Sequence, residues 1–219
     1  VKEVEDPQID DDSALLRVES VCVCGSDIRI FRHGNPRVTF PQIVGHEVSG
    51  VVEERGEGVS KFAVGQRICL AADVPCGTCR WCTIGLGNNC ARNYAIGYQF
   101  DGGFAEHMLV NKVTMDYGPV HAVPENLDDE EAAIAEPVAC AVNGLEIVGM
   151  SAGKSIVIIG LGPIGCLMIP LARHMGATKV IAVQRSAKRM EMAKQFGADV
   201  YLASEEEDVV RRCREETGG

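Results

Sequence analysis

The sequence S-I-V-I-I-G-L-G-P-I-G, residues 155–165, decides the fold of the C-terminal part of this chain. It begins with an apolar run typical of a buried strand, and the residues that follow match the pattern G-x-G-x-x-G. Glycines in this pattern permit a tight turn and let a pyrophosphate closely approach the start of the next helix. An incidental strand-helix turn is the alternative. The pattern favours a dinucleotide site at Gly160, Gly162, Pro163, Ile164 and Gly165.

Strand and helix patterns alternate beyond this loop. Residues 164–175 are expected to form a helix and residues 179–183 a second strand. Ser186 is expected to cap another helix, which Gly197 ends. This order predicts parallel strands joined by right-handed crossovers, and therefore an α/β fold in this part of the chain.

The end of the second strand bears on the choice of nicotinamide cofactor. Members of this fold that bind NAD generally place an acidic residue there, which accepts hydrogen bonds from the adenosine ribose. Here the residues are Gln184, Arg185 and Ser186. No carboxylate repels a 2′-phosphate and Arg185 is able to bind one, whereas Gln184 can still hydrogen-bond an unphosphorylated ribose. The sequence predicts NAD or NADP, with NADP slightly favoured.

Four cysteines spaced C-x2-C-x2-C-x7-C lie in a loop-like segment, residues 73–97. A loop of this length with no core of its own needs a staple. Four thiolates satisfy tetrahedral zinc, so the spacing favours a structural zinc site. An iron–sulfur cluster, two disulfides or four unrelated thiols are the alternatives, although cluster runs typically place their last cysteine closer and before proline. The expected ligands are Cys76, Cys79, Cys82 and Cys90.

A second set of potential ligands is scattered and chemically mixed, as an open catalytic zinc site would be. Its members are Cys24, His46, Glu47 and Glu136. Each alone is weak evidence, because His46 could be a hydrogen-bonded core histidine and Cys24 could share a strand face with Cys22. Their contexts, Cys-Gly-Ser-Asp, Gly-His-Glu and Glu-Pro, favour a joint role.

Half-buried strands are predicted in the N-terminal part of the chain. Apolar and polar residues partly alternate over residues 16–21, 47–53, 66–70 and 104–110. Carboxylates at residues 128–131 then open an apolar helical run. We expect a catalytic domain over residues 1–147, including a zinc lobe at 73–97, and part of a dinucleotide-binding domain over residues 148–219.

Composition argues against several classes of partner. The net charge of −10 and the pI near 5.0 disfavour nucleic acid. No apolar run approaches the ~20 residues that span a bilayer, so no membrane partner is expected. Ten cysteines indicate metal ligands more than disulfides, which favours the cytoplasm. A dinucleotide sheet normally needs about six strands and this sequence supplies about three, so we expect a longer protein.

Taken together, these motifs resemble the zinc-dependent medium-chain dehydrogenase/reductase family, most closely its polyol branch with the sorbitol (iditol) dehydrogenases. The resemblance spans nearly the whole chain and implies a GroES-like, β-rich catalytic domain followed by a Rossmann domain, truncated here. It also implies a homodimer or homotetramer in the complete protein. The matching segments, in family order, are Cys24-Gly-Ser-Asp, Gly45-His-Glu, the cysteine lobe, Gly102-Gly-Phe-Ala-Glu, Glu136-Pro and the glycine loop.

The resemblance implies roles for the residues of the mixed set. Cys24 and His46 would be zinc ligands, and Glu47 a third ligand or an exchanging near-ligand. Glu136 occupies a position that is glutamate in polyol and sugar dehydrogenases. Ser26 would accept the proton of the substrate hydroxyl, whose pKa the zinc would lower.

Arg29 departs from the family pattern. Many relatives carry there a histidine that ends a proton relay, whereas an arginine stays protonated and cannot act as a base. Arg29 would instead favour an anionic substrate, or contact the cofactor or a neighbouring carboxylate.

The implied activity is hydride transfer between NAD(P) and a secondary alcohol, namely a polyol or sugar derivative with or without a phosphate. Threonine or glucose dehydrogenase-like activity and a non-catalytic zinc- and nucleotide-binding relative are the alternatives. Retention of Cys24, Ser26 and His46 argues against the last, because a sensor has no need for an open metal site. The intact ligand sets disfavour a zinc-independent quinone reductase.

Overall fold

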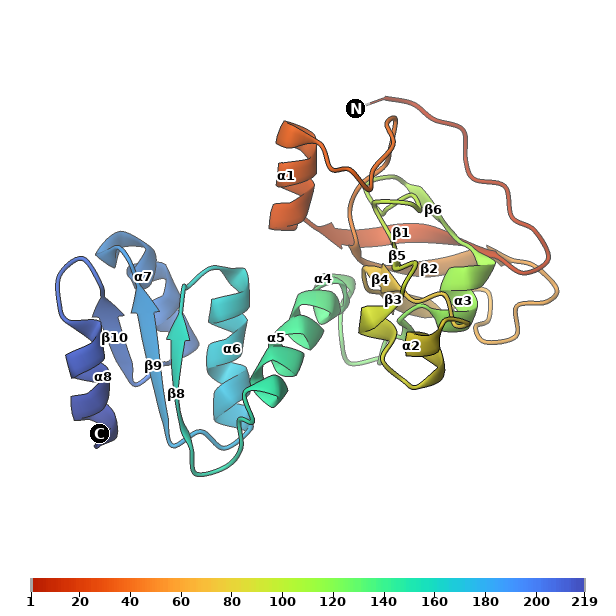
Figure 1. Cartoon of the computed structure of the whole chain (residues 1–219). Coiled ribbons are helices and arrows are strands. Elements are labelled where there is room, and N and C mark those ends of the chain that lie inside the picture. Colours follow the sequence, from red (N-terminus) through yellow and green to blue (C-terminus); the bar gives the residue numbers. More distant parts are fainter. Residues whose placement is uncertain (1, 219) are drawn as a thin grey trace. The chain divides into compact units, whose positions relative to one another are not determined.

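Two compact units make up the chain, Val1–Glu136 and Pro137–Gly219 (Figure 1). The computed structural model describes residues 2–218. Antiparallel strands dominate the first unit, and parallel strands alternate with helices in the second. The predicted fold class, a β-rich domain followed by part of an α/β domain, is confirmed.

A five-stranded antiparallel sheet in the order β6-β1-β2-β3-β7 forms the core of the first unit. Apolar side chains such as Leu16, Val48 and Ile68 are completely buried in it. The four strands predicted for this part of the chain are confirmed. The strands are β1 (Ala14–Cys22), β2 (Glu47–Arg55), β3 (Arg67–Leu70), β6 (His107–Val110) and β7 (Val120–Ala122).

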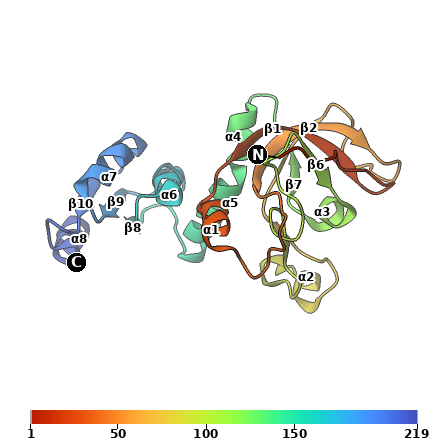
Figure 2. The same cartoon turned by 90° about the horizontal axis from the view of Figure 1, so that it is seen from above.

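The cysteine-rich loop has little regular structure of its own. Its ends pair as β4 (Asp73–Val74) and β5 (Tyr94–Ala95), with α2 (Arg80–Thr83) and the single turn η1 (Gly87–Asn89) between them. Residues 77–89 include no buried side chain. Figures 1 and 2 both show α2 to one side of the sheet. The loop therefore lacks an apolar core, as its sequence predicts.

Outside the cysteine-rich loop, two helices of the first unit are not predicted from the sequence, α1 (Gly25–His33) and α3 (Lys112–Tyr117). In α1, Asp27 and Ile30 are buried whereas Phe31 is 87% exposed. Its apolar residues therefore do not form one stripe, which hides the helical period. The Cys-Gly-Ser-Asp motif forms the beginning of this helix.

Carboxylates open helix α4 (Asp129–Ala133) as predicted. The Asp128 side chain accepts a hydrogen bond from the Glu131 amide at 2.7 Å, and the Glu131 side chain accepts one from the Asp128 amide at 3.1 Å. Helix α5 (Ala135–Ile147) follows, and its Leu145 packs into the core of the second unit. The compact units thus divide between Glu136 and Pro137, in the first turn of α5 and earlier than position 147/148, and the domain boundary itself stays a prediction.

The second unit contains a parallel sheet in the order β10-β9-β8, formed by β8 (Ser155–Ile159), β9 (Lys179–Gln184) and β10 (Val200–Ala203). Val180 and Ala182 pack into one apolar cluster, while Ile181 and Val183 pack into another. Helices α6 (Pro163–His174) and α7 (Ala187–Ala193) lie on one face, and α8 (Val209–Thr217) lies on the other (Figure 2). Alternate residues of β9 therefore face two helical layers, as in a doubly wound fold.

The end of helix α7 agrees with the sequence analysis, but its start differs in detail. Ser186 occupies the N-cap position, yet its side chain makes no capping hydrogen bond. The prediction that the helix begins after Ser186 is therefore confirmed, but the capping hydrogen bond expected from its side chain is not formed. The single turn η2 (Lys194–Phe196) continues the helix, and Gly197 ends it with a left-handed φ of 78°.

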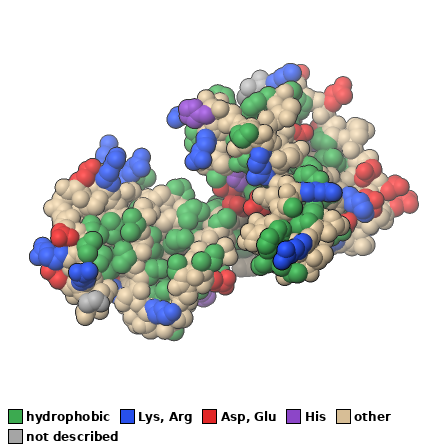
Figure 3. All heavy atoms as spheres, viewed as in Figure 1, with side chains coloured by type: hydrophobic (Ala, Val, Ile, Leu, Met, Phe, Trp, Pro, Cys, Tyr) green, Lys and Arg blue, Asp and Glu red, His purple; other side chains and the backbone are tan. Residues whose placement is uncertain are grey.

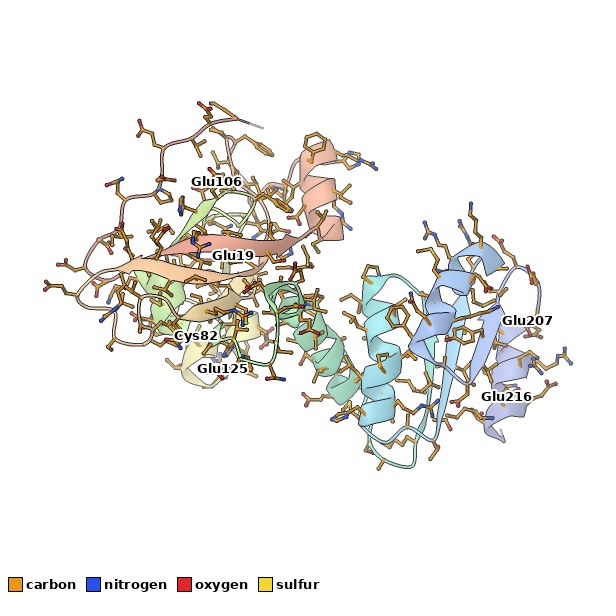
Figure 4. The ribbon with its side chains drawn as sticks, turned by 180° about the vertical axis from the view of Figure 1, so that it is seen from behind. Glu19, Cys82, Glu106, Glu125, Glu207 and Glu216 are labelled. Carbon is orange, nitrogen blue, oxygen red and sulfur yellow. The ribbon has the colours of Figure 1, made fainter. Side chains whose placement is uncertain are left out.

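The surface of the second unit carries both an ion pair and a group of exposed apolar side chains. Lys179 on β9 forms an ion pair with Glu216 on α8 at 2.9 Å (Figure 4). Hydrophobic side chains gather over the strands of this unit (Figure 3), and Ile159 is 81% exposed beside Val157 and Ile164. Among residues 2–218, no helix is long and apolar enough to cross a membrane.

Candidate metal and cofactor sites

The four lobe cysteines converge. Their sulfur atoms all lie within 4.8 Å of one another, with separations of 3.5 Å for Cys79–Cys82, 3.9 Å for Cys79–Cys90 and 4.0 Å for Cys76–Cys82. Tetrahedral zinc with Zn–S bonds of ~2.3 Å requires sulfurs about 3.8 Å apart. A disulfide would require ~2.05 Å, and all four thiols are free. The donor set therefore fits one closed metal site.

Backbone amides point at these sulfurs. The amides of Cys76 and Asn93 donate to the sulfur of Cys90 at 3.2 and 3.3 Å. A hydrogen bond from the backbone of Thr78, helped by its hydroxyl, lowers the pKa of Cys76 to about 6. Burial raises the pKa of Cys82 to about 11. A cation at the centre of the tetrad would favour the thiolate form of all four.

Gly77, next to Cys76, is required by packing. Its φ of 72° lies in the left-handed region, and a Cβ there would meet the ring of Tyr117 at 2.2 Å. Tyr117 ends helix α3, so the lobe turn rests directly on an element outside the lobe. A larger residue at this position would be strained at this φ and would have to push the Tyr117 ring aside.

The second ligand group forms where β1 meets β2. Cys24 lies between β1 and α1, His46 precedes β2, and Glu47 is the first residue of β2. Because β1 and β2 pair antiparallel, the end of one strand lies beside the start of the other. The ligand atoms of Cys24, His46 and Glu47 lie within 4.8 Å of one another. Residues far apart in sequence thus form one mixed thiolate, imidazole and carboxylate group.

Asp27 holds this group together, and the sequence analysis gave it no role. Its carboxylate accepts hydrogen bonds from the Cys24 amide at 2.9 Å and the Gly45 amide at 3.2 Å, and Oδ1 lies 3.4 Å from His46 Nδ1. Only 4% of Asp27 is exposed. Burial opposes ionisation, but the His46 contact and the Cys24 amide hold the pKa of Asp27 below its usual range. Its spacing from Cys24, on the third residue of a helix, is the signal that could have identified it.

The two nitrogens of His46 face different partners. Nδ1 faces Asp27, and Nε2 lies 3.4 Å from the hydroxyl of Ser26. Burial lowers the pKa of His46, but the contacts with Asp27 and Cys24 outweigh it and raise the pKa to about 9. A carboxylate behind a metal-binding histidine fixes the ring orientation and raises its basicity as a ligand. The imidazole is therefore oriented with one edge toward the ligand group.

Two further residues of the predicted catalytic set belong to the first unit but not to the ligand group. Glu136 is half-buried in the first turn of α5, and the group within 4.8 Å does not include it. Arg29 is exposed on α1, one turn beyond Ser26 on the same side of the helix. The structure thus brings together Cys24, Ser26, His46 and Glu47, and the roles of Glu136 and Arg29 stay predictions.

The glycine loop has the geometry that its pattern predicts. Gly160 has a φ of 97°, which favours glycine, and a Cβ on Gly165 would meet the carbonyl oxygen of Gly160 at 1.9 Å. A Cβ on Gly162 would meet nothing within 4 Å, so the space in front of helix α6 is open. Gly162 is the N-cap of α6 and Pro163 its first residue, with Ile164 39% exposed beside them. An anion fits the exposed amides at this helix start.

The end of β9 carries the other predicted cofactor residues. Gln184 accepts a hydrogen bond from the Arg185 amide at 2.8 Å, and Ser186 follows as the N-cap of α7. The Arg185 side chain is 83% exposed and lies 3.5 Å from the carboxylate of Glu205, which is 59% exposed. Such a solvent-exposed pair contributes little to stability, so Arg185 remains able to bind an anion.

The chain matches two protein-family models. Residues 10–124 match the model described as "Alcohol dehydrogenase GroES-like domain", and residues 163–219 match "Zinc-binding dehydrogenase". The first match alone covers more than half of the chain. It contains both metal-ligand groups except Glu136, and the second begins inside the glycine loop, at Pro163.

Similar proteins of known sequence carry related names. A zinc-type alcohol dehydrogenase-like protein of Haemophilus influenzae is 37% identical over 100% of this chain and 63% of its own length. A sorbitol dehydrogenase of Halalkalibacterium halodurans is 33% identical over 100% and 63%. A D-arabitol-phosphate dehydrogenase of Enterococcus avium is 33% identical over 97% and 60%. The chain therefore spans less than two thirds of the length of these relatives.

Solved structures agree with this likeness. The alcohol dehydrogenase of a Thermus species has a TM-score of 0.91 at 33% identity, covering 99% of this chain and 63% of that one. A zinc-binding dehydrogenase from Sinorhizobium meliloti bound to NADP has a TM-score of 0.87 at 36% identity, covering 95% and 59%. An alcohol dehydrogenase from Escherichia coli complexed with NADH has a TM-score of 0.87 at 30% identity, covering 97% and 61%.

Proposed function

Because the chain belongs to the zinc-dependent medium-chain dehydrogenase/reductase family, in its polyol dehydrogenase-like branch, we propose that the complete protein is an NAD(P)-dependent alcohol dehydrogenase. It would transfer a hydride between the cofactor and a secondary alcohol. The observation that carries this proposal is the convergence of Cys24, His46 and Glu47 within 4.8 Å, beside the Ser26 hydroxyl. A mixed ligand group next to a proton acceptor suits a catalytic metal, whereas four like thiolates suit a structural one.

Each residue of the open site has a separate task. A zinc ion held by Cys24, His46 and Glu47, with Glu136 as the fourth residue of the set, would lower the pKa of a bound alcohol and stabilise the alkoxide. Ser26 accepts the proton that the alcohol loses. Asp27 orients His46 from behind, and Arg29 is unable to pass the proton on, so the proton leaves through water or a ribose hydroxyl.

The proposed substrate class is a polyol or sugar derivative, with or without a phosphate. It rests on the sorbitol and D-arabitol-phosphate dehydrogenases among the relatives. Threonine or glucose dehydrogenase-like activity is the alternative within the same chemistry. A non-catalytic zinc- and nucleotide-binding protein is disfavoured, because it would have no need of Ser26 next to an open ligand group.

The proposed cofactor is NAD or NADP, with NADP slightly favoured. The exposed Arg185 and the absence of a carboxylate at Gln184 support the preference. Similar structures hold either cofactor, NADP in one case and NADH in another. The glycine loop would take the pyrophosphate, with Gly162 leaving room for it at the start of α6.

We also propose a homodimer or homotetramer, as in the family, and a cytoplasmic location. The location is supported by the ten cysteines of the sequence, which suit metal ligands in a reducing compartment more than disulfides.

A substrate screen on the complete protein tests this function. Neutral polyols, polyol phosphates, threonine and glucose should be tried with NAD and with NADP, by following nicotinamide absorbance. We expect turnover of at least one polyol or polyol phosphate, with a higher kcat/KM for NADP. Ser26→Ala should lower kcat by about 100-fold or more, and Ser26→Thr should retain much of it. No turnover of any alcohol by protein that holds its full metal content would contradict the proposal.

A further inference from the structure

A buried polar network ties the start of helix α4 to strand β2. Ser49 on β2 is completely buried. Its hydroxyl donates a hydrogen bond to the carbonyl oxygen of Asp129 at 2.7 Å and lies 3.2 Å from the Asp129 carboxylate. Asp129 is the first residue of α4, so this contact fixes the helix start against the sheet.

Arg67 on β3 completes the network from the neighbouring strand. Its Nε donates to the Asp129 carboxylate at 3.2 Å, and a terminal nitrogen lies 3.2 Å from the same oxygen. The other terminal nitrogen donates to the carbonyl oxygen of Leu127 at 2.8 Å. The planar guanidinium thus binds the chain on both sides of Asp128, an arrangement that the compact ammonium of lysine would not reproduce.

Strand β2 links this network to the open ligand group. Glu47 and Ser49 are two residues apart and therefore point to the same face of the strand. Glu47 belongs to the ligand group and Ser49 to the network, and both are buried. One rigid strand thus sets the position of a metal-site residue and of the helix start at the same time.

Helix α4 leads from the network toward Glu136. Ala132 and Ala133 are buried, so the short helix packs closely as well as being tied at its start. Only Ile134 separates α4 from α5, in whose first turn Glu136 lies. Since α4 has little freedom, the place where α5 begins follows from where Asp129 is held.

We propose that Ser49, Arg67 and Asp129 are positioning residues for the catalytic metal site, which they serve by placing Glu136 relative to Cys24, His46 and Glu47. This inference rests on the proposed function, in which Glu136 completes the ligand set. The network acts on metal affinity through geometry.

Adjacent carboxylates supply a matched pair of variants. Asp128→Ala removes the capping box of α4 but leaves the tie to β2 and β3 in place. Asp129→Ala and Arg67→Met each remove the contact between the Asp129 carboxylate and the Arg67 guanidinium, and leave both the cap and the hydrogen bond from Ser49 to the Asp129 carbonyl in place. The readouts are the melting temperature and the affinity for the more weakly held zinc, measured by competition with a chromogenic chelator. The Cys24→Ser variant should lose the more weakly held zinc if that zinc occupies the catalytic site.

We expect Asp129→Ala and Arg67→Met to lower the zinc affinity of the catalytic site by about 10-fold or more. This is the effect typical of groups that orient metal ligands. Arg67→Lys should recover only part of the affinity. Asp128→Ala should lower the melting temperature and leave the affinity within about twofold. Equal losses of zinc affinity in the Asp128 and Asp129 variants, or none in either, would overturn the inference.

A double variant separates the inference from the function on which it rests. If the network acts through Glu136, Asp129→Ala should add little to the affinity already lost in Glu136→Gln. A full additional loss in that background would show that the network does not position Glu136 and would overturn the inference alone. A wild-type protein with no catalytic zinc would instead contradict the proposed function.

Discussion

The two metal-ligand groups of the first unit are built in opposite ways. The tetrad of Cys76, Cys79, Cys82 and Cys90 comes from one loop that has no apolar core. The trio of Cys24, His46 and Glu47 comes from the junction of two paired strands that belong to the main sheet. We therefore expect the lobe to depend on its metal for stability, whereas the paired strands of the main sheet hold the trio in place.

The two groups also differ in the ligand chemistry that they offer a metal. Four sulfurs at tetrahedral spacing leave no position for a substrate. The trio is mixed, lies beside a serine hydroxyl and has a buried carboxylate, Asp27, behind its histidine. The difference teaches that four like thiolates in one loop suit a closed site that stabilises the loop, whereas a mixed group with a buried carboxylate behind its histidine suits catalysis.

The largest expected difference is in thermal stability, between a variant that loses a tetrad ligand and a variant that loses a trio ligand. A structural zinc supplies about 12 kcal/mol, and loss of a third of this, ~4 kcal/mol, would lower Tm by about 12 °C in a protein of this size. We therefore expect Cys79→Ser to lower Tm by about 10 °C or more. Cys24→Ser should change Tm by less than about 3 °C and abolish most activity, as differential scanning calorimetry and an alcohol oxidation assay would show.

Equal losses of Tm in these two variants would break the comparison, because both groups would then be structural. Cys69→Ser is a suitable control. Cys69 is a half-buried thiol on β3 that belongs to neither group, so its replacement should leave zinc content and activity unchanged.

A smaller effect concerns Arg29, an exposed cation one helical turn from Ser26. If Arg29 favours anionic substrates, Arg29→Gln should raise KM for a polyol phosphate by about 10-fold and leave KM for the neutral polyol nearly unchanged, because only the phosphate gains from the cation. Arg32→Gln, on the same helix, serves as the control for a general change of charge. Steady-state kinetics on paired substrates provide the measurement. Equal changes of KM for neutral and charged substrates would show that Arg29 does not select anionic substrates.

The sequence predicts local features of this molecule well. The tetrad and the glycine loop are each specified by short spacing patterns whose geometry follows from neighbouring residues. Gly165 shows why, since a side chain at this position would collide with the carbonyl oxygen of Gly160 whatever the rest of the fold does. The strands were found because their alternating pattern follows directly from burial on one face.

Features that depend on distant contacts were harder to predict. Helix α1 was missed because it buries Asp27 and exposes Phe31, against the usual pattern. Asp27 itself gains its meaning only when the Gly45 amide and His46 meet it. The tie between Ser49 and Asp129 joins residues eighty positions apart, and no pattern in the sequence marks it.

Zinc content of the purified complete protein tests the central claim most directly. Two independent ligand groups predict two zinc ions per subunit in the wild-type protein, measured by inductively coupled plasma mass spectrometry after exhaustive dialysis. Cys24→Ser should retain one zinc and its fold, because the tetrad is untouched. One zinc in the wild-type protein, retained in full by Cys24→Ser, would contradict the account by showing that the trio of Cys24, His46 and Glu47 holds no metal.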